Sequence, residues 1–188
     1  SQVGATQISF LLGAERLIDN YKKFGFSKPV SINFPSTSFG EINSREKISD
    51  IEIATLGYGY GLTATPFQIS QAYAIFANNG IYHDFRIIKD SEFPIFSEQI
   101  ISESTAKDIL YSMKEVVDNG TGILAKSENY DVSGKTGTTE KLRDGNYKSS
   151  TYTASFIGIG PNPSNELTIF VNIDGLGSQK YSGGSVAA

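Results

Sequence analysis

The amino-acid sequence predicts an α+β fold in which a helical lobe, residues 1–125, precedes an antiparallel sheet lobe, residues 126–188. Apolar residues recur at helical spacing in three segments before residue 120, whereas after residue 132 they alternate with polar residues. Helices followed by strands favour an antiparallel sheet over repeated β–α–β units. No linker composition separates the two parts, so we treat them as lobes of one domain.

Composition excludes several classes of function. Hydrophobic residues make up 39% of the 188 residues and charged residues 19%, which indicates a packed core. The 16 basic and 20 acidic residues give a net charge of -4 without basic clusters, so we expect no nucleic-acid partner. The chain has no cysteine and one histidine, His83. We therefore expect no metal, no cofactor and no thiol nucleophile, while the redox compartment stays open.

The first two helices are predicted by apolar spacing and by their end signals. A helix is expected over residues 5–24, with Lys22 and Lys23 in its last turn and Gly25 ending it. Residues 26–64 are expected to be irregular. Thr65 to Gln68 then matches a capping box with proline at the first helical position, which predicts a helix that ends at the pair Asn79-Gly80.

The third helix follows a mixed connecting stretch, residues 81–100. It is expected to begin near Ser102 or Ser104 and to end at Asn119-Gly120. Its predicted apolar face consists of Ala106, Ile109, Leu110, Met113, Val116 and Val117. Beyond it, alternation predicts strands over residues 132–138, 151–159 and 167–173, and the turn at residues 161–165 makes the last two a hairpin.

The segment Ser133-Gly-Lys-Thr-Gly-Thr-Thr139 is the densest candidate site. Its Gly-Lys-Thr triplet suggests a phosphate-binding loop, but Asn129 stands where that motif needs glycine. The motif also requires a helix after the lysine, and here another strand is predicted. The nucleotide interpretation therefore fails on both counts.

The other interpretation is the Lys-Thr-Gly triplet of active-site serine acyl-transferases. Lys135 would attract a substrate carboxylate, and the hydroxyls of Thr136 and Thr138 would hydrogen-bond it. Gly137 would let a peptide lie along the strand, and the backbone N–H of Thr138 would donate into an oxyanion hole. For three residues alone, a solvated turn is the simpler interpretation.

The surrounding motifs decide between these interpretations because they resemble, in order and spacing, the transpeptidase domain of penicillin-binding proteins. The matching segments are 58–68 (Tyr-Gly-Tyr-Gly-Leu-Thr-Ala-Thr-Pro-Phe-Gln), 77–82, 120–122 (Gly-Thr-Gly), 134–138, 152–158 and 181–188. The resemblance covers the whole chain. It is most similar to class B enzymes of the division-septum type, with the elongation type still open.

The resemblance implies a penicillin-binding transpeptidase or serine β-lactamase-like fold, truncated at both ends. It implies an enzyme that cross-links peptidoglycan stem peptides through a serine acyl-enzyme and is the target of β-lactam antibiotics. Septal cell-wall synthesis proteins are the implied protein partners. The implied location is the bacterial inner membrane, with the catalytic domain in the periplasm and the anchor outside this chain. A serine β-lactamase or D,D-carboxypeptidase, or a non-catalytic penicillin-recognising sensor, stays open as an alternative.

Two of the family's three catalytic motifs are not intact in the chain. The Ser-x-x-Lys nucleophile motif is expected before residue 1, so we expect this chain alone to be inactive. Gln2 occupies the position of the asparagine in Ser-x-Asn, with Ser1, native or from a tag, in the middle position. Ser44 and Ser104 each begin a further Ser-x-x-Lys match, but both follow the Ser-x-Asn region, which is the wrong order.

Two further expectations concern the rim of the site and the sheet. By resemblance, Tyr147 and Tyr181 fall at the rim of the substrate pocket. The three strands are expected to have an unpaired edge and an uncovered apolar face, lined by Leu167, Ile169, Val171 and Ile173 or by the opposite set. Such a surface recruits a partner, so the chain is expected to self-associate or to be less stable than a complete domain.

Overall fold

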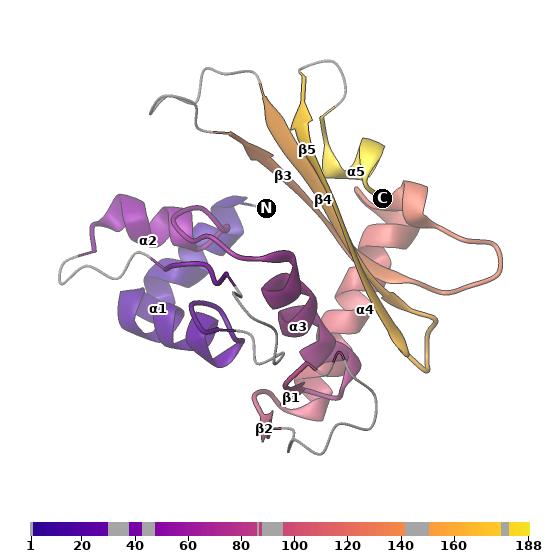
Figure 1. The fold of residues 1–188 in the computed structure, drawn as a ribbon, viewed down its shortest axis with the longest axis horizontal. Coiled ribbons are helices and arrows are strands. Elements are labelled where there is room, and N and C mark those ends of the chain that lie inside the picture. The colour runs from indigo at the N-terminus through magenta and orange to yellow at the C-terminus, as the bar shows by residue number, and fades with distance from the viewer. Residues whose placement is uncertain are drawn as a thin grey trace. The chain divides into compact units, whose positions relative to one another are not determined.

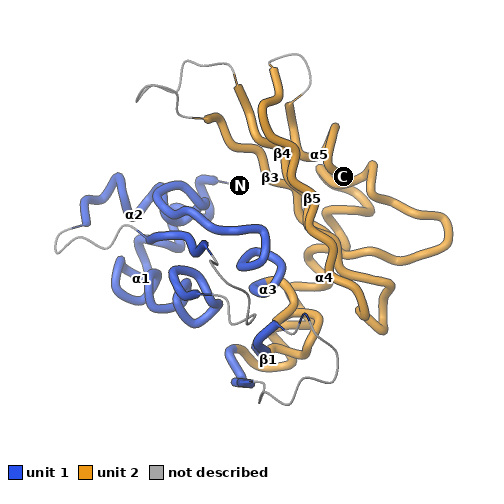
Figure 2. Tube along the Cα trace, viewed as in Figure 1, with its two compact units in different colours: residues 1–72, 82–100 blue, residues 73–81, 101–188 orange. Residues whose placement is uncertain are grey.

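The fold is described by a computed structural model that covers residues 2–29, 38–42, 48–85, 87, 96–141, 151–177 and 181–188. Figure 1 shows helices α1 to α4 along the first two-thirds of the chain and a three-stranded sheet near its C-terminus. The chain divides into two compact units, residues 1–72 with 82–100 and residues 73–81 with 101–188 (Figure 2). The α+β fold class predicted from the sequence is confirmed.

The first unit contains α1 (Gln2–Lys23), α2 (Asp50–Leu56) and the first part of α3 (Pro66–Ala77). Its core is formed by four buried residues, Leu17, Ile18, Ile42 and Leu56. α1 has the predicted apolar spacing, but Gly13 is non-helical, with φ 76° and ψ 162°. Because that backbone break changes the direction of the helix, Leu17 and Ile18 are buried while Leu11 is exposed.

A short helix corrects the expectation that residues 26–64 are irregular, and two short strands lie in the mixed connecting stretch, residues 81–100. α2 begins with a capping box in which Ser49 and Glu52 each accept a hydrogen bond from the other's backbone N–H. The Ser-x-x-Glu signal was therefore in the sequence, although the helix is only seven residues long. In the later stretch, β1 (Ile81–His83) pairs with β2 (Ser97–Gln99).

The predicted capping box of α3 is confirmed, and its glutamine does more than cap. The backbone N–H of Gln68 donates to Thr65 Oγ1 at 3.2 Å, and Thr65 N–H donates to Gln68 Oε1 at 3.0 Å. The same buried amide accepts from Gly40 N–H and donates to the carbonyls of Gly25 and Lys28. One side chain thus satisfies backbone groups of three loops that would otherwise be buried without partners.

The second unit contains α4 (Glu103–Asn119), a short 3₁₀ turn η1 (Ile123–Ala125), the sheet and α5 (Gly183–Val186). On α4, the buried residues are Ala106, Met113 and Val117, whereas Ile109 is exposed, so the apolar stripe is narrower than expected. The predicted boundary at residue 125 puts the helices in one lobe and the strands in the other. In the structure, α4 belongs to the same compact unit as the sheet.

The sheet has the strand order β3-β4-β5, with both neighbouring pairs antiparallel. The strands are β3 (Ser133–Glu140), β4 (Tyr152–Gly160) and β5 (Leu167–Leu176), which confirms the three predicted strands and the hairpin. β3 and β5 each have a neighbour on one side only, among the described residues. Edge strands leave alternate backbone N–H and C=O groups available to another chain.

Among the described residues, one face of the sheet is covered at one end only. Ala154 and Phe156 pack with Val117 of α4 and Ala187 near α5, and Ile173 packs against this cluster. Each large apolar side chain buried there contributes roughly 1.5–3 kcal/mol. Leu167, Ile169 and Val171 lie on the same face and are exposed, the first two by 58% and 57%. The expected uncovered face is therefore present for these three residues, but not for Ile173.

Candidate functional site

The candidate site is the outer edge of β3, which carries Lys135, Thr136, Gly137 and Thr138. In the register of the sheet these residues oppose Ile157, Phe156, Ser155 and Ala154 of β4. Side chains alternate along a strand, so Thr136 and Thr138 point to the face that packs against α4 and α5, and Lys135 points to the other face. The outer edge of β3, on the side away from β4, has no neighbouring strand among the described residues.

Lys135 is an exposed cation whose ammonium lies close to the strand. Its Nζ donates to the backbone carbonyl of Thr136 at 2.7 Å. Protein atoms around the side chain displace part of its water, and this burial lowers the pKa of Lys135 below its ordinary value. A partly desolvated ammonium attracts an anion more strongly than one fully surrounded by water. The lysine at this edge can therefore serve as a carboxylate-binding group.

The two threonine hydroxyls are each held by a group from another element. Thr136 Oγ1 lies 2.9 Å from Oγ1 of Thr121, a residue of the turn after α4. Thr138 Oγ1 accepts a hydrogen bond of 2.9 Å from the backbone N–H of Gly183 in α5. Because Gly183 uses a lone pair of the Thr138 hydroxyl, the proton of that hydroxyl remains available to a ligand. The hydrogen bond between the hydroxyls of Thr121 and Thr136 uses only one of their two hydroxyl protons.

Glycines allow the close packing around these hydroxyls. A Cβ at Gly137 would lie 2.4 Å from Ser155 Oγ, so a side chain there would require the Ser155 hydroxyl to move. A Cβ at Gly183 would lie 2.3 Å from the Gly137 carbonyl oxygen and 2.4 Å from that of Ser155. A Cβ at Gly184 would lie 2.1 Å from the Thr121 carbonyl oxygen. α5 can therefore contact the sheet only because these positions have no side chain.

Tyr181 and Tyr152 form a stacked pair next to this strand. Their ring centroids are 4.0 Å apart and their planes are inclined by 21°. Tyr152 begins β4 and opposes Glu140, the last residue of β3. The pKa of Tyr152 is raised above its ordinary value, mainly by partial desolvation and secondly by the nearby carboxylate of Glu140. Both effects favour the neutral phenol.

The remaining predicted site residues lie elsewhere or outside the description. Gln2 is the first residue of α1 and is exposed in the first unit. Tyr147 and Ser1 lie outside the described residues, as does Ser44. His83, in β1, is exposed. Within the described part of the chain, the structure thus brings together Lys135, Thr136, Gly137, Thr138 and Tyr181.

The Ser-x-x-Lys match at Ser104 has a structural explanation. Ser102, two residues earlier, is the N-cap of α4 and accepts from Thr105 N–H at 3.1 Å. The hydroxyl of Ser104 lies 2.9 Å from that of Ser102, and the ammonium of Lys107 pairs with Glu103. Lys107 is therefore engaged by a carboxylate one turn away, and the pattern belongs to the beginning of a helix.

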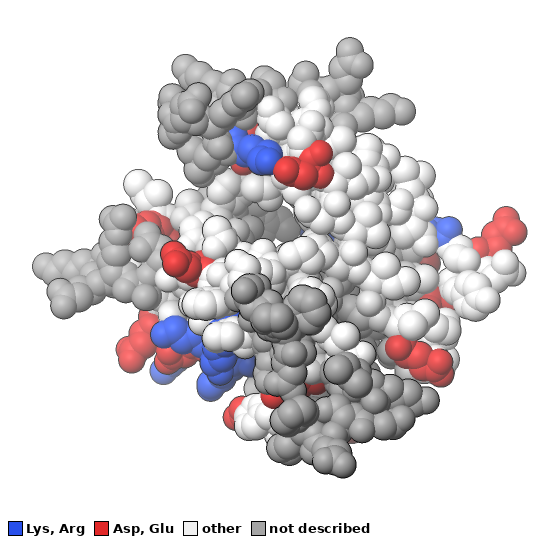
Figure 3. Space-filling model, in the orientation of Figure 1, with Lys and Arg blue, Asp and Glu red and all other residues white. Residues whose placement is uncertain are grey.

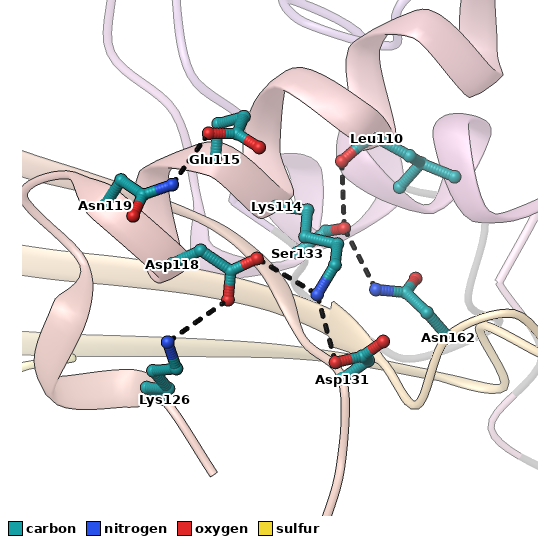
Figure 4. A network of polar contacts seen from close by, with 9 residues as sticks. All are labelled: Leu110, Lys114, Glu115, Asp118, Asn119, Lys126, Asp131, Ser133 and Asn162. Atoms are coloured by element: carbon teal, nitrogen blue, oxygen red, sulfur yellow. Dashed lines mark hydrogen bonds and ion pairs between the residues drawn. The ribbon is translucent and has the colours of Figure 1, made fainter.

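A polar network that sequence reasoning missed anchors the beginning of β3 (Figure 4). Ser133 Oγ donates to the carbonyl of Leu110 in α4 at 2.9 Å and accepts from Asn162 Nδ2 at 3.3 Å. Lys114 pairs with Asp118 at 3.1 Å and with Asp131 at 3.0 Å. The contacts of Ser133 fix the strand two residues before Lys135. No local sequence signal indicates these contacts or the pair Lys114–Asp131, because they join residues far apart in the chain, whereas Lys114 and Asp118 are one helical turn apart.

Charged side chains of both signs are distributed over the face shown in Figure 3, and no extended basic field is present among its described residues. A basic field is what a nucleic-acid surface needs. The candidate binding site of the second unit is therefore the β3 edge, where one lysine and two threonine hydroxyls lie together.

Comparison with known proteins identifies the family of the chain. The family model described as the penicillin-binding protein transpeptidase domain matches residues 1–188. The chain belongs to this family. It is 34% identical to Stage V sporulation protein D of Bacillus subtilis, covering 98% of this chain and 30% of that protein. It is 32% identical to the peptidoglycan D,D-transpeptidase FtsI of Escherichia coli K12, covering 100% of this chain and 32% of that protein.

Solved transpeptidase domains share the fold. The TP domain of Burkholderia pseudomallei penicillin-binding protein 3 has a TM-score of 0.89 and 30% identity, over 100% of this chain and 57% of that chain. Penicillin-binding protein 3 of Mycobacterium tuberculosis, solved with aztreonam, has a TM-score of 0.87 and 28% identity, over 93% of this chain and 43% of that chain. The chain spans about a third of the length of the curated relatives it matches.

Proposed function

We propose that this chain is part of a peptidoglycan D,D-transpeptidase of the division-septum type, which is also the target of β-lactam antibiotics. The observation that carries the proposal is the outer edge of β3, which has no neighbouring strand among the described residues and where Lys135, Thr136 and Thr138 offer one ammonium and two held hydroxyls. Relatives over the full chain that are named peptidoglycan D,D-transpeptidases support the reaction class.

The reaction proceeds in two steps. The hydroxyl oxygen of a serine on the upstream part of the domain attacks the carbonyl carbon between the two D-alanines of a stem peptide. The C–N bond breaks, D-alanine leaves with the proton as a free amine, and the stem peptide remains as an ester on the serine. An amine of a second stem peptide then attacks this ester, forms the cross-link and returns the proton to the serine.

Residues of this chain hold the donor peptide and stabilise the charge that develops on it. Lys135 binds the terminal carboxylate, with the hydroxyls of Thr136 and Thr138 as further donors. The backbone N–H of Thr138 donates to the oxyanion of the tetrahedral intermediate. Gly137 lets the peptide approach the strand closely enough for main-chain hydrogen bonds. From the family resemblance we also propose that Gln2 donates to a substrate carbonyl and that Tyr147 and Tyr181 belong to the pocket rim.

The proposed location and partners follow from the family. We propose a catalytic domain in the bacterial periplasm, held to the inner membrane by an anchor in another part of the protein and working with septal cell-wall synthesis proteins. In the described residues of this chain, no helix is long and apolar enough to cross a membrane.

The test is the acylation rate of the transpeptidase domain that contains this chain. Lys135→Ala should reduce the second-order rate of acylation by a penicillin ten- to a hundredfold, because a charge-assisted contact contributes about 1.5–3 kcal/mol. Lys107→Ala, which removes an exposed lysine on α4, is the matched control and should leave the rate unchanged. An unchanged rate in Lys135→Ala would remove the lysine from the site.

The subsequent fate of the acyl-enzyme distinguishes the alternative functions. A transpeptidase should deacylate a penicilloyl adduct slowly and join two stem peptides. Fast hydrolysis of the adduct would instead identify a β-lactamase. Slow hydrolysis without any product from paired stem peptides would identify a sensor.

A further inference from the structure

Ser133, the first residue of β3, carries a buried hydroxyl that is bonded to two other elements (Figure 4). Its side chain is 1% exposed. The hydroxyl donates to the Leu110 carbonyl of α4 at 2.9 Å and accepts from Asn162 Nδ2, in the turn between β4 and β5, at 3.3 Å. A buried hydroxyl costs folding free energy unless it has such partners, whereas a buried alanine needs none. The serine therefore provides a directional tie between elements rather than apolar packing.

The tie lies on the face of β3 that carries Lys135. Side chains alternate along a strand, so Ser133 and Lys135 project to the same face, about 7 Å apart. On the other face, Val117 of α4 packs with Phe156 of β4. α4 thus contacts the sheet on both faces of β3, and the contact on the lysine face is the hydrogen bond from Ser133 to Leu110.

Further contacts hold the residue that leads into β3. The backbone N–H of Asn162 donates to the carbonyl of Asp131 at 2.8 Å, and the side chain of the same asparagine donates to Ser133. Lys114 of α4 pairs with the carboxylate of Asp131 at 3.0 Å. The beginning of β3 is therefore held both by α4 and by the turn after β4.

The ammonium of Lys135 depends on this strand for its own position. Its Nζ donates to the backbone carbonyl of Thr136, so a shift of the strand moves the ammonium as well. β3 has a neighbouring strand on one side only among the described residues, so β4 alone aligns it within the sheet. Misplacement of a binding group by about 1 Å can slow a reaction by as much as about a hundredfold.

We propose that Ser133 is a positioning residue for the carboxylate of the acyl donor: by tying β3 to Leu110, it determines where the ammonium of Lys135 lies. The proposal rests on the proposed function, because it assumes that Lys135 binds this carboxylate. Ser133 is buried and acts through the strand, without touching the donor. Its effect on acylation should therefore be present only while the lysine is present.

The test is a double-mutant cycle in the transpeptidase domain that contains this chain, with the second-order rate of acylation by benzylpenicillin as the readout. Ser133→Ala should slow acylation about three- to tenfold when Lys135 is present. In the Lys135→Ala background, the same change should alter the rate less than twofold. Ser112→Ala is the matched control and should leave the rate unchanged, because it removes an exposed hydroxyl that bonds to the Asp108 carbonyl within α4.

Two further variants separate positioning from a loss of stability. Ile159 opposes Ser133 on β4 and is fully buried. Ile159→Val destabilises the same part of the sheet without removing a hydrogen bond, so it should leave the acylation rate within twofold. Asn162→Ala removes the donor to Ser133 and should slow acylation in the same lysine-dependent way, which keeps the test available if Ser133→Ala does not fold.

Equal fold losses in the two backgrounds would show a purely structural role for Ser133 and overturn the proposal. An unchanged rate in Ser133→Ala with Lys135 present would also overturn it, as would an equally large loss in Ile159→Val. A Lys135→Ala domain that acylates as fast as the unsubstituted domain would instead overturn the proposed function of the lysine, and this proposal with it.

Discussion

Gly183 and Thr138 are joined by a hydrogen bond of 2.9 Å between the backbone N–H of one and Oγ1 of the other, although they are 45 residues apart in sequence. The bond occupies an acceptor site of the hydroxyl and leaves its proton to a ligand. It also connects α5 to the strand that carries Lys135. A change in α5 can therefore alter the edge of β3 without touching any residue of the Lys-Thr-Gly motif.

Gly183→Ala should destabilise the protein. The new Cβ would lie 2.3 Å from the Gly137 carbonyl oxygen and 2.4 Å from that of Ser155, and neither backbone atom can move without shifting the sheet. Overpacking of this kind costs about 1–3 kcal/mol in free energy of unfolding. Chemical denaturation measures the loss. Gly177→Ala is the matched control because a Cβ there meets nothing within 4 Å, and equal stability of the two variants would contradict the close contact.

Acylation should decrease on the alkaline side of the pH profile. Burial lowers the pKa of Lys135, and only the protonated amine attracts a carboxylate. The second-order acylation rate should therefore fall as the pH rises through a value below 10.5, the ordinary pKa of lysine. Lys135→Arg keeps its charge in this range and should move the decrease to higher pH. An identical alkaline limb in Lys135→Arg would assign it to another group.

The 188-residue chain alone should form no covalent adduct with a penicillin. In the described residues, the Ser-x-x-Lys match at Ser104 lies in the first turn of α4, where Lys107 is paired with Glu103. Intact-mass measurement after incubation with benzylpenicillin should show the unmodified mass. A stoichiometric adduct on Ser104, or on Ser44, would show that the order of motifs was misinterpreted.

The 188-residue chain should also self-associate at micromolar concentration. Leu167, Ile169 and Val171 are exposed on one face of β5. Leu167 and Ile169 also line an apolar groove of about 520 Å3 that includes Tyr130 and Phe156. β5 lacks a neighbour on one side among the described residues, so edge pairing is available. Light scattering should detect oligomers, and Ile169→Lys should reduce them. A monomer with a cooperative unfolding transition at high temperature would contradict this prediction.

Periodicity was sufficient to predict the long elements. The strand around Ile169 alternates large aliphatic residues with the residues between them, and α3 and α4 carry capping signals at Thr65 and Ser102. The predicted family, and with it the fold, rests on many motifs in register, and it is confirmed.

Contacts between distant residues could not be predicted in this way. The bond from Ser133 to the Leu110 carbonyl, the pairing of Thr121 with Thr136 and the stack of Tyr152 on Tyr181 all depend on tertiary packing. The break at Gly13 was also missed, because a single glycine within a helical pattern is compatible with an unbroken helix. The site motif is thus visible in the sequence, whereas the groups that orient its hydroxyls are not.

The side-chain amide of Gln68 couples the opening of several loops in the first unit. Its oxygen accepts hydrogen bonds from the backbone N–H groups of Gly40 and Thr65, and its nitrogen donates to the carbonyls of Gly25 and Lys28. Neither the loop at Gly25 nor that at Gly40 can open fully while this group stays in place. The backbone amides of Gly40 and Thr65 should therefore exchange with deuterium at a common rate, since one opening event exposes both to solvent.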